Sequence, residues 1–126
     1  MTSAQFPTTP LHLTVTRPEG AGHTVVIDLH GDLDYDSADY LLQTATQQIT
    51  DDSALTDLHL DCAGLEAIDS MGLSVLLMLQ RRTTAADVVL HLEGRTARLD
   101  RLLTITGTLD HLTGSVPARE QDTLAR

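Results

Sequence analysis

Aromatic side chains are almost absent from this sequence. Its 126 residues include no Trp, two Tyr and one Phe, an aromatic share of 2%. Proteins that bind bases or sugars commonly stack them on aromatic rings, so binding platforms of that kind are excluded. The length is that of one ordinary domain. Its core must be aliphatic, because Leu, Val, Ile and Ala make up most of the 41% hydrophobic residues.

Positive charge is scarce, and lysine is missing altogether. The chain has 18 acidic and 8 basic residues, all of the latter Arg, and a net charge of −10. Twelve of the acids and none of the bases lie between Pro18 and Gln80, whereas seven of the eight Arg lie from Arg81 onward. This negative field repels nucleic acid and anionic membranes, so we expect neither as a partner. It suits a protein partner with a basic face, although excess acid also serves solubility alone.

Cysteine and long apolar runs are equally rare. Cys62 is the single cysteine, so no disulfide can form within the chain. The longest apolar run, Leu73–Leu79, is interrupted by Ser74 and is far shorter than the ~20 residues that span a bilayer. The first residues lack the basic and apolar segments of a secretory signal peptide. We therefore expect a soluble, cytoplasmic protein.

The hydrophobic periodicity alternates between the spacing of strands and that of helices. The pattern predicts, in order, strand, strand, helix, strand, helix, strand and helix over residues 11–16, 23–29, 38–50, 58–61, 70–84, 88–92 and 95–105. The Arg17–Gly20 turn predicts that the first two strands pair as a hairpin. The polar segments 31–36 and 62–69 are expected to be loops, with Asp36 as the N-cap of the first helix.

Strands that alternate with helices favour an α/β fold with a mostly parallel sheet. Polar residues such as Asp28, His59 and His91 recur on one side of the strands. One sheet face is therefore poorly buried, which favours two layers over a doubly wound sandwich. We expect a flexible arm over residues 1–10, a domain over 11–113 and a frayed tail over 114–126.

No motif for catalysis, metal binding or a cofactor is present. Ser70 lacks the glycine two residues earlier that a nucleophile elbow requires, because Ile68 stands there. Metal-binding spacings of His and Cys and a glycine-rich phosphate loop before a helix are also missing. The alternating Asp28, Asp32, Asp34 and Asp36 are more typical of a solvated loop than of a carboxylate site. We expect no enzymatic activity, no metal and no cofactor.

The helix that begins at Ser70 carries two apolar sides. Its second side consists of Met71, Val75 and Met78, with Ser74 beside them. This stripe is either buried, in a helix covered on both sides, or exposed, where methionine adapts well to a partner surface. At the start of the helix, Ser70 fits the role of a simple N-cap.

Four short segments resemble the STAS-domain anti-sigma factor antagonists of bacteria. They are Gly31-Asp32-Leu33-Asp34, Ile68-Asp69-Ser70-Met71-Gly72-Leu73, Arg98-Leu99 and Thr106-Gly107-Thr108-Leu109. The resemblance covers residues 11–112. It implies a STAS-like two-layer fold, with a mixed, mostly parallel sheet of about four to five strands and helices mainly on one face.

The resemblance also implies a function, which is partner switching. The unphosphorylated antagonist binds an anti-sigma factor that is also a serine kinase and so releases a sigma factor. The kinase phosphorylates the serine that corresponds to Ser70, the complex dissociates, and a serine phosphatase resets the cycle. Asp34, Asp69 and Gly72 would then shape the phosphorylation site. We interpret Met71, Ser74, Val75 and Met78 as the stripe that contacts the partner.

Two points qualify this resemblance. Many members of the family carry a second small hydroxyl residue after the phosphorylated serine, where this chain has Met71. A bulkier side chain there would narrow the range of kinases or shift the docking pose. The alternative function is a STAS subunit that is a fixed scaffold in a signalling or transport assembly, with Ser70 acting only as a cap.

Overall fold

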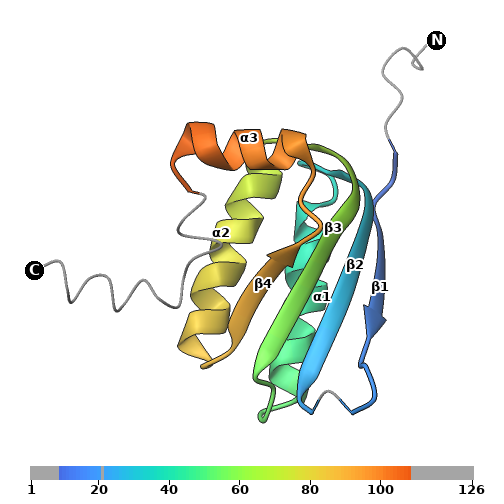
Figure 1. Ribbon diagram of the computed structural model, residues 1–126, viewed down its shortest axis with the longest axis vertical. Coiled ribbons are helices and arrows are strands. Elements are labelled where there is room, and N and C mark those ends of the chain that lie inside the picture. The colour runs from blue at the N-terminus through green and yellow to red at the C-terminus, as the bar shows by residue number, and fades with distance from the viewer. Residues whose placement is uncertain (1–8, 21, 109–126) are drawn as a thin grey trace, which may run out of the picture.

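The computed structural model describes residues 9–20 and 22–108. In chain order the elements are β1 (His12–Thr16), β2 (Thr24–Leu33), α1 (Ala38–Asp51), β3 (Asp57–Ile68), α2 (Ser70–Ala85), β4 (Val89–Glu93) and α3 (Ala97–Thr106). The type and order of every predicted element are thus confirmed (Figure 1).

The described strands form a four-stranded sheet in the order β1-β2-β3-β4. β1 runs antiparallel to β2, as the predicted hairpin requires, and Val15 lies opposite Ile27. β2 and β3 are parallel, and so are β3 and β4. The sheet is therefore mixed and mostly parallel, as the sequence predicts.

β2 and β3 are longer than the sequence predicts. β2 continues to Leu33 and β3 continues to Ile68, so residues 31–33 and 62–68 are not loop. The two extensions pair with each other, and Leu33 lies opposite Ile68. Register shifts interrupt this pairing on both sides of Gly31, which explains why the local sequence looks like a turn although the chain remains extended.

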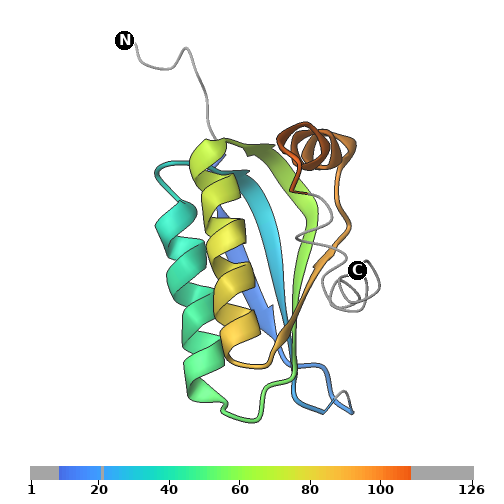
Figure 2. The same cartoon turned by 90° about the vertical axis from the view of Figure 1, so that its left-hand side faces the viewer.

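Two layers account for most of the molecule. Figure 2 shows α1 and α2 side by side on one face of the sheet. Fully buried leucine and isoleucine side chains fill the space between these layers: Ile27, Leu29, Leu41, Leu58, Leu60 and Leu76. α3 lies across one end of the opposite face and buries Leu99 and Leu103. The polar side chains predicted for that face, Asp28, His59 and His91, are only half-buried.

The chain contacts β2 before the first strand begins. The Thr9 amide donates to Asp32 Oδ2 at 3.1 Å, and the Asp32 amide donates to the Thr9 carbonyl at 3.0 Å. The end of the predicted flexible arm is therefore bound to β2. The rest of that arm and the predicted tail over 114–126 lie outside the described residues. Within the described part, no helix is both long and apolar enough to cross a membrane.

Candidate functional site

The segments that follow β2 and β3 lie next to each other, because the two parallel strands end at the same edge of the sheet (Figure 1). The Asp69 amide donates to the Leu33 carbonyl at 3.2 Å. In return, Asp69 Oδ2 accepts the backbone amide of Tyr35 at 2.9 Å. The structure thus brings together the two motifs that carry the family resemblance.

Asp69 also begins α2. It occupies the N-cap position, and its Oδ1 accepts the Gly72 amide at 2.9 Å. The prediction that Ser70 is the N-cap is therefore wrong, because the preceding carboxylate has taken that role and Ser70 is the first residue of the helix. The Ser70 side chain is exposed. Within the described residues it makes no hydrogen bond.

Asp34 organises the other loop from within. Its Oδ1 accepts the amides of Asp36 and Ser37 at 3.1 and 3.2 Å. The Ser37 hydroxyl in turn donates to the Asp32 carbonyl at 2.8 Å. Ser37, not Asp36, occupies the N-cap position of α1, so that prediction is wrong by one residue. Asp34 binds the amides before the helix, and Ser37 itself makes no side-chain cap hydrogen bond to α1.

Gly72 allows the first turn of α2 to lie against the end of β2. A Cβ atom at this position would clash with the Leu33 carbonyl and would lie 2.9 Å from Ile68 Cγ1. The close approach at Gly72 is therefore between two elements of this chain. It sets the distance between the Ser70 end of α2 and the loop that contains Tyr35.

Only some residues of the contact stripe that the sequence predicts lie on the outer side of α2. Met71 is 42% exposed, Ser74 is exposed and Met78 is half-buried. Val75 is 4% exposed and belongs to the core, so its prediction as a partner contact is wrong. The helix is covered on two sides, by the sheet and by α1, and Val75 faces this packing rather than solvent.

Sequence reasoning missed Tyr35 as a surface feature. Its side chain is 74% exposed, while its backbone amide is held by Asp69, the residue before Ser70. One available signal was that Tyr35 is one of very few aromatic residues and stands between Asp34 and Asp36. We use the name docking surface for a set of four exposed residues and one half-buried residue: Tyr35, Ser70, Met71 and Ser74, with Met78.

The charge beside the docking surface is negative. Asp34, Asp36 and Asp69 all lie in the two segments that build it, and both oxygens of Asp69 are engaged with backbone amides. On the neighbouring edge, Arg98 donates to the carbonyl of Glu66 at 3.1 Å. An apolar surface with an acidic rim fits a protein partner whose own rim is basic.

The sequence matches the profile of the family described as "Mlab, STAS domain" over residues 16–114. This chain belongs to the STAS domain family. No curated protein matches the chain in sequence.

Solved structures with this fold come from several kinds of protein. The anti-sigma factor antagonist SpoIIAA in its unphosphorylated form has a TM-score of 0.61 and 20% identity, with coverage of 74% of this chain and 82% of that chain. SpoIIAA of Bacillus in the phosphorylated form has a TM-score of 0.62 and 21% identity, with 76% and 84% covered. An anti-sigma factor antagonist from Mycobacterium paratuberculosis has a TM-score of 0.69 and 20% identity, with 82% and 83% covered.

The same fold also occurs inside a membrane transporter. The murine anion transporter Slc26a9 has a TM-score of 0.65 and 18% identity, with coverage of 75% of this STAS chain but 15% of that chain. At these identities the similarity shows the STAS fold, which both regulators and transporter subunits share.

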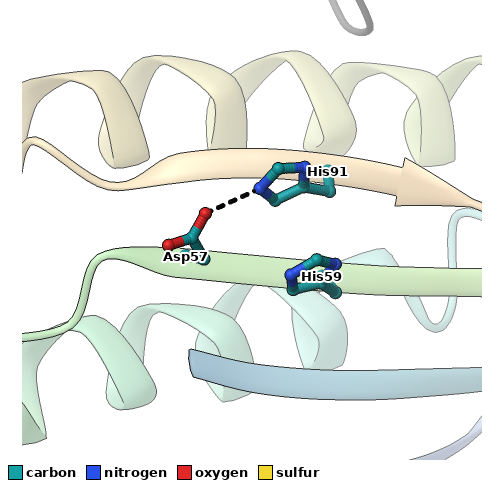
Figure 3. A group of neighbouring side chains, drawn as sticks. All are labelled: Asp57, His59 and His91. Carbon is teal, nitrogen blue, oxygen red and sulfur yellow. Dashed lines mark hydrogen bonds and ion pairs between the residues drawn. The ribbon is translucent and has the colours of Figure 1, made fainter. Parts of the chain in front are cut away.

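A second cluster of side chains lies on the sheet face that α1 and α2 leave open. Asp57 and His59 of β3 lie beside His91 of β4 (Figure 3). Sequence reasoning had placed both histidines on this face but had not paired them. A signal was available, since the tripeptide Leu-His-Leu occurs at 58–60 and again at 90–92.

Proposed function

We propose that this STAS protein is an anti-sigma factor antagonist controlled by phosphorylation of Ser70. In its unphosphorylated form it binds an anti-sigma factor that has serine kinase activity, and a sigma factor is released. The observation that carries the proposal is the position of Ser70. Its exposed hydroxyl stands at the first residue of α2, between the Asp69 cap and the exposed Met71.

Ser70 is accessible to a kinase without local unfolding. Its side chain is exposed and has no hydrogen-bond partner among the described residues, whereas each oxygen of the adjacent Asp69 already accepts a backbone amide. A kinase can therefore reach the hydroxyl while Asp69 still holds the two loops in place. The solved forms of SpoIIAA, one unphosphorylated and one phosphorylated, support this use of the fold.

Phosphorylation would change the charge of the docking surface more than its shape. A phosphate adds about −1.5 to −2 charges at neutral pH. The Gly72 amide already donates to Asp69 Oδ1 and the Leu73 amide to the Asp69 carbonyl, so neither can bind the phosphate without giving up that bond. The new charge would thus remain next to Asp69 and on the surface that a partner must cover. Removing it from water against a partner is unfavourable, and the complex would dissociate.

The proposal describes a binding protein and not an enzyme. A serine phosphatase that acts on phospho-Ser70 would restore the binding form. With a net charge of −10, we propose protein partners rather than nucleic acid or a membrane. We place this partner switching in the cytoplasm, where ATP is available to the kinase.

The test is a comparison of Ser70→Ala with Ser70→Asp as bait in a lysate of the host. We expect Ser70→Ala to capture an ATP-dependent anti-sigma kinase and Ser70→Asp to lose it. Ser53→Asp is the matched control, because it adds the same charge at an exposed position in the loop after α1, and it should bind like the wild type. Incubation with the captured kinase and ATP should place phosphate on Ser70, and the Ser70→Ala variant should receive none.

A second function is favoured by the transporter relative. The STAS fold of Slc26a9 is part of an anion transporter, and the docking surface described above could equally bind one partner permanently. In that case this chain would be a scaffold subunit of a signalling or transport assembly. Equal capture of the same proteins by Ser70→Ala and Ser70→Asp would support the scaffold and contradict the switch.

A further inference from the structure

The open face of the sheet carries two histidines in direct contact. His59 of β3 and His91 of β4 are register partners. Their rings stack with centroids 4.2 Å apart and planes 8° from parallel. Asp57 lies two residues before His59 and so points to the same face. Figure 3 shows it to one side of the rings, with His91 turned toward it.

Carboxylates orient both rings. Glu93 Oε2 lies 2.8 Å from His59 Nδ1, and Asp57 Oδ2 lies 2.8 Å from His91 Nε2. With Nδ1 of His59 donating to Glu93, the lone pair of the neutral ring is on Nε2. A carboxylate on the far nitrogen of a histidine is the usual support of a metal-binding imidazole. Thr56 fixes the carboxylate of Asp57, since its hydroxyl donates to Oδ1 at 2.7 Å.

The geometry points to a site for a divalent transition metal, and we propose that Asp57, His59 and His91 bind Zn²⁺. One ligand atom from each residue lies within 4.8 Å of the other two. Tetrahedral zinc, with bonds of about 2.0–2.2 Å, separates its ligands by about 3.4 Å. The rings lie 8° from parallel, so binding one ion requires them to rotate out of the stack until their lone pairs converge; all three side chains are only half-buried. The ion would replace the proton between His91 and Asp57, and His91 would carry its proton on Nδ1.

Charge on this face favours a cation. The register places Asp28, Asp61 and Glu93 in one row across β2, β3 and β4, next to the row that holds His59 and His91. With both histidines neutral, the ligands and Glu93 together carry two negative charges, which a divalent ion neutralises. Two imidazoles and one carboxylate select zinc-like ions over Mg²⁺ or Ca²⁺, which prefer oxygen alone. Three protein ligands leave a fourth position for water or for a partner's side chain.

This site is independent of Ser70 and of the proposed partner switch. It departs from the expectation that the chain has no metal site, which followed from the lack of a metal motif in the sequence. Such motifs place their ligands close together in the chain. Here the two histidines come from strands that meet only in the folded sheet.

The experiment is calorimetric titration of Zn²⁺ into the full chain after removal of metals with a chelator. We expect one ion per chain with a dissociation constant of about 1 μM or tighter, and little heat from Mg²⁺. The double variant His59→Gln/His91→Gln should bind at least 100-fold more weakly. Glu93→Gln should bind about 10- to 100-fold more weakly, because it loses only the support of one ligand.

His12→Gln/His23→Gln is the matched control, since it removes two exposed histidines outside the cluster, and it should keep the wild-type affinity. NMR of the wild type provides a test without mutation, because Zn²⁺ should shift the ring signals of His59 and His91. Equal affinity of the wild type and the His59→Gln/His91→Gln variant would show adventitious binding to surface histidines. That result, or the absence of binding below about 1 mM, would overturn the proposal.

Discussion

At the scale of single residues, the environment of a side chain decides its chemistry. Ser70 and Cys62 both carry small, potentially reactive groups. Ser70 is exposed beside an acidic loop, whereas Cys62 is fully buried in β3, with 0% of its side chain exposed. Desolvation, with a smaller contribution from the Asp61 charge, raises the pKa of Cys62 to about 12. Ser70 is therefore the group available for modification.

Cys62 should be unreactive in the native protein. A thiol reagent such as iodoacetamide needs the thiolate and access to it, so modification should require urea. On folding, the pKa of Cys62 rises from 9.0 to about 12, so below pH 9 the thiol is protonated in both states and does not lower the free energy of unfolding. As the pH rises from 9 toward 12, the unfolded state loses the proton first, and the free energy of unfolding falls by about 2 kcal/mol at pH 10.5.

Urea unfolding of the wild type and of Cys62→Ala at pH 8 and pH 10.5 measures this loss. The variant should lose less stability at the higher pH than the wild type does. Rapid alkylation of Cys62 in the native protein would contradict the prediction. Because the chain has no lysine, few other side chains change their charge between pH 8 and pH 10.5.

At the scale of secondary-structure elements, the N-cap residues of α2 and α3 differ in the number of segments that they bind. Thr96 caps α3 alone, and its hydroxyl accepts the Leu99 amide at 3.1 Å. Asp69 caps α2 and also holds the amide of Tyr35 in the loop after β2. The cap of α2 therefore links two segments that are far apart in the sequence, and it positions Tyr35 beside Ser70.

Asp69→Ala should destabilise the protein by about 2 kcal/mol, because it removes a cap and leaves a second amide without its acceptor. Thr96→Ala is the comparison and should cost about 1 kcal/mol. Urea unfolding gives both free energies, and hydrogen exchange at the Tyr35 amide reports the loop directly. We expect faster exchange at Tyr35 in Asp69→Ala than in Thr96→Ala. Equal exchange in both variants would show that Asp69 does not hold the loop.

At the scale of the whole molecule, charge is the most unusual property. The net charge of −10 on 126 residues favours association with a basic partner, but it also produces repulsion within the folded chain. Few basic side chains relieve this repulsion in the first two-thirds of the chain. Arg17, which bonds to Asp52 at 3.3 Å, is one of them.

Salt should therefore stabilise the protein. Raising NaCl from 0.01 to 0.15 M shortens the screening length from about 30 Å to about 8 Å. We expect the urea midpoint to rise over this range, because screening reduces repulsion among the acids. The variant Asp36→Asn/Asp39→Asn, at two exposed positions, should show a smaller rise. A fall in the wild-type midpoint would mean that ion pairs such as Arg17–Asp52 outweigh the repulsion.

The sequence predicted what depends on neighbours along the chain. Alternating residues such as Leu58 and Leu60 predicted strands, and helical spacing predicted α1, α2 and α3. The polar residues His59 and His91 predicted the open sheet face. Where the predictions were wrong, a distant segment intervened: β2 and β3 lengthen because they pair with each other, and Val75 is buried because α2 packs on two sides.

The residues of the candidate site also fall into two groups, those that the local sequence predicts and those that depend on distant segments. Ser70, Asp69 and Gly72 were recognisable from a short local motif, and the structure places them at the start of α2. Tyr35 beside Ser70 depends on one hydrogen bond between segments 34 residues apart. The pair His59 and His91 depends on the register of two parallel strands, which neither strand encodes alone.

The sequence by itself determined the order of the elements, the aliphatic core, the acidic surface and the position of the candidate phosphorylation site. These follow from composition and short-range periodicity, since each depends on residues within a few turns or a single strand. Only the tertiary structure decided the extent of β2 and β3, the double role of Asp69 and the contact between His59 and His91. Each of these requires contacts between segments far apart in the chain, and such contacts exist only after the sheet has formed.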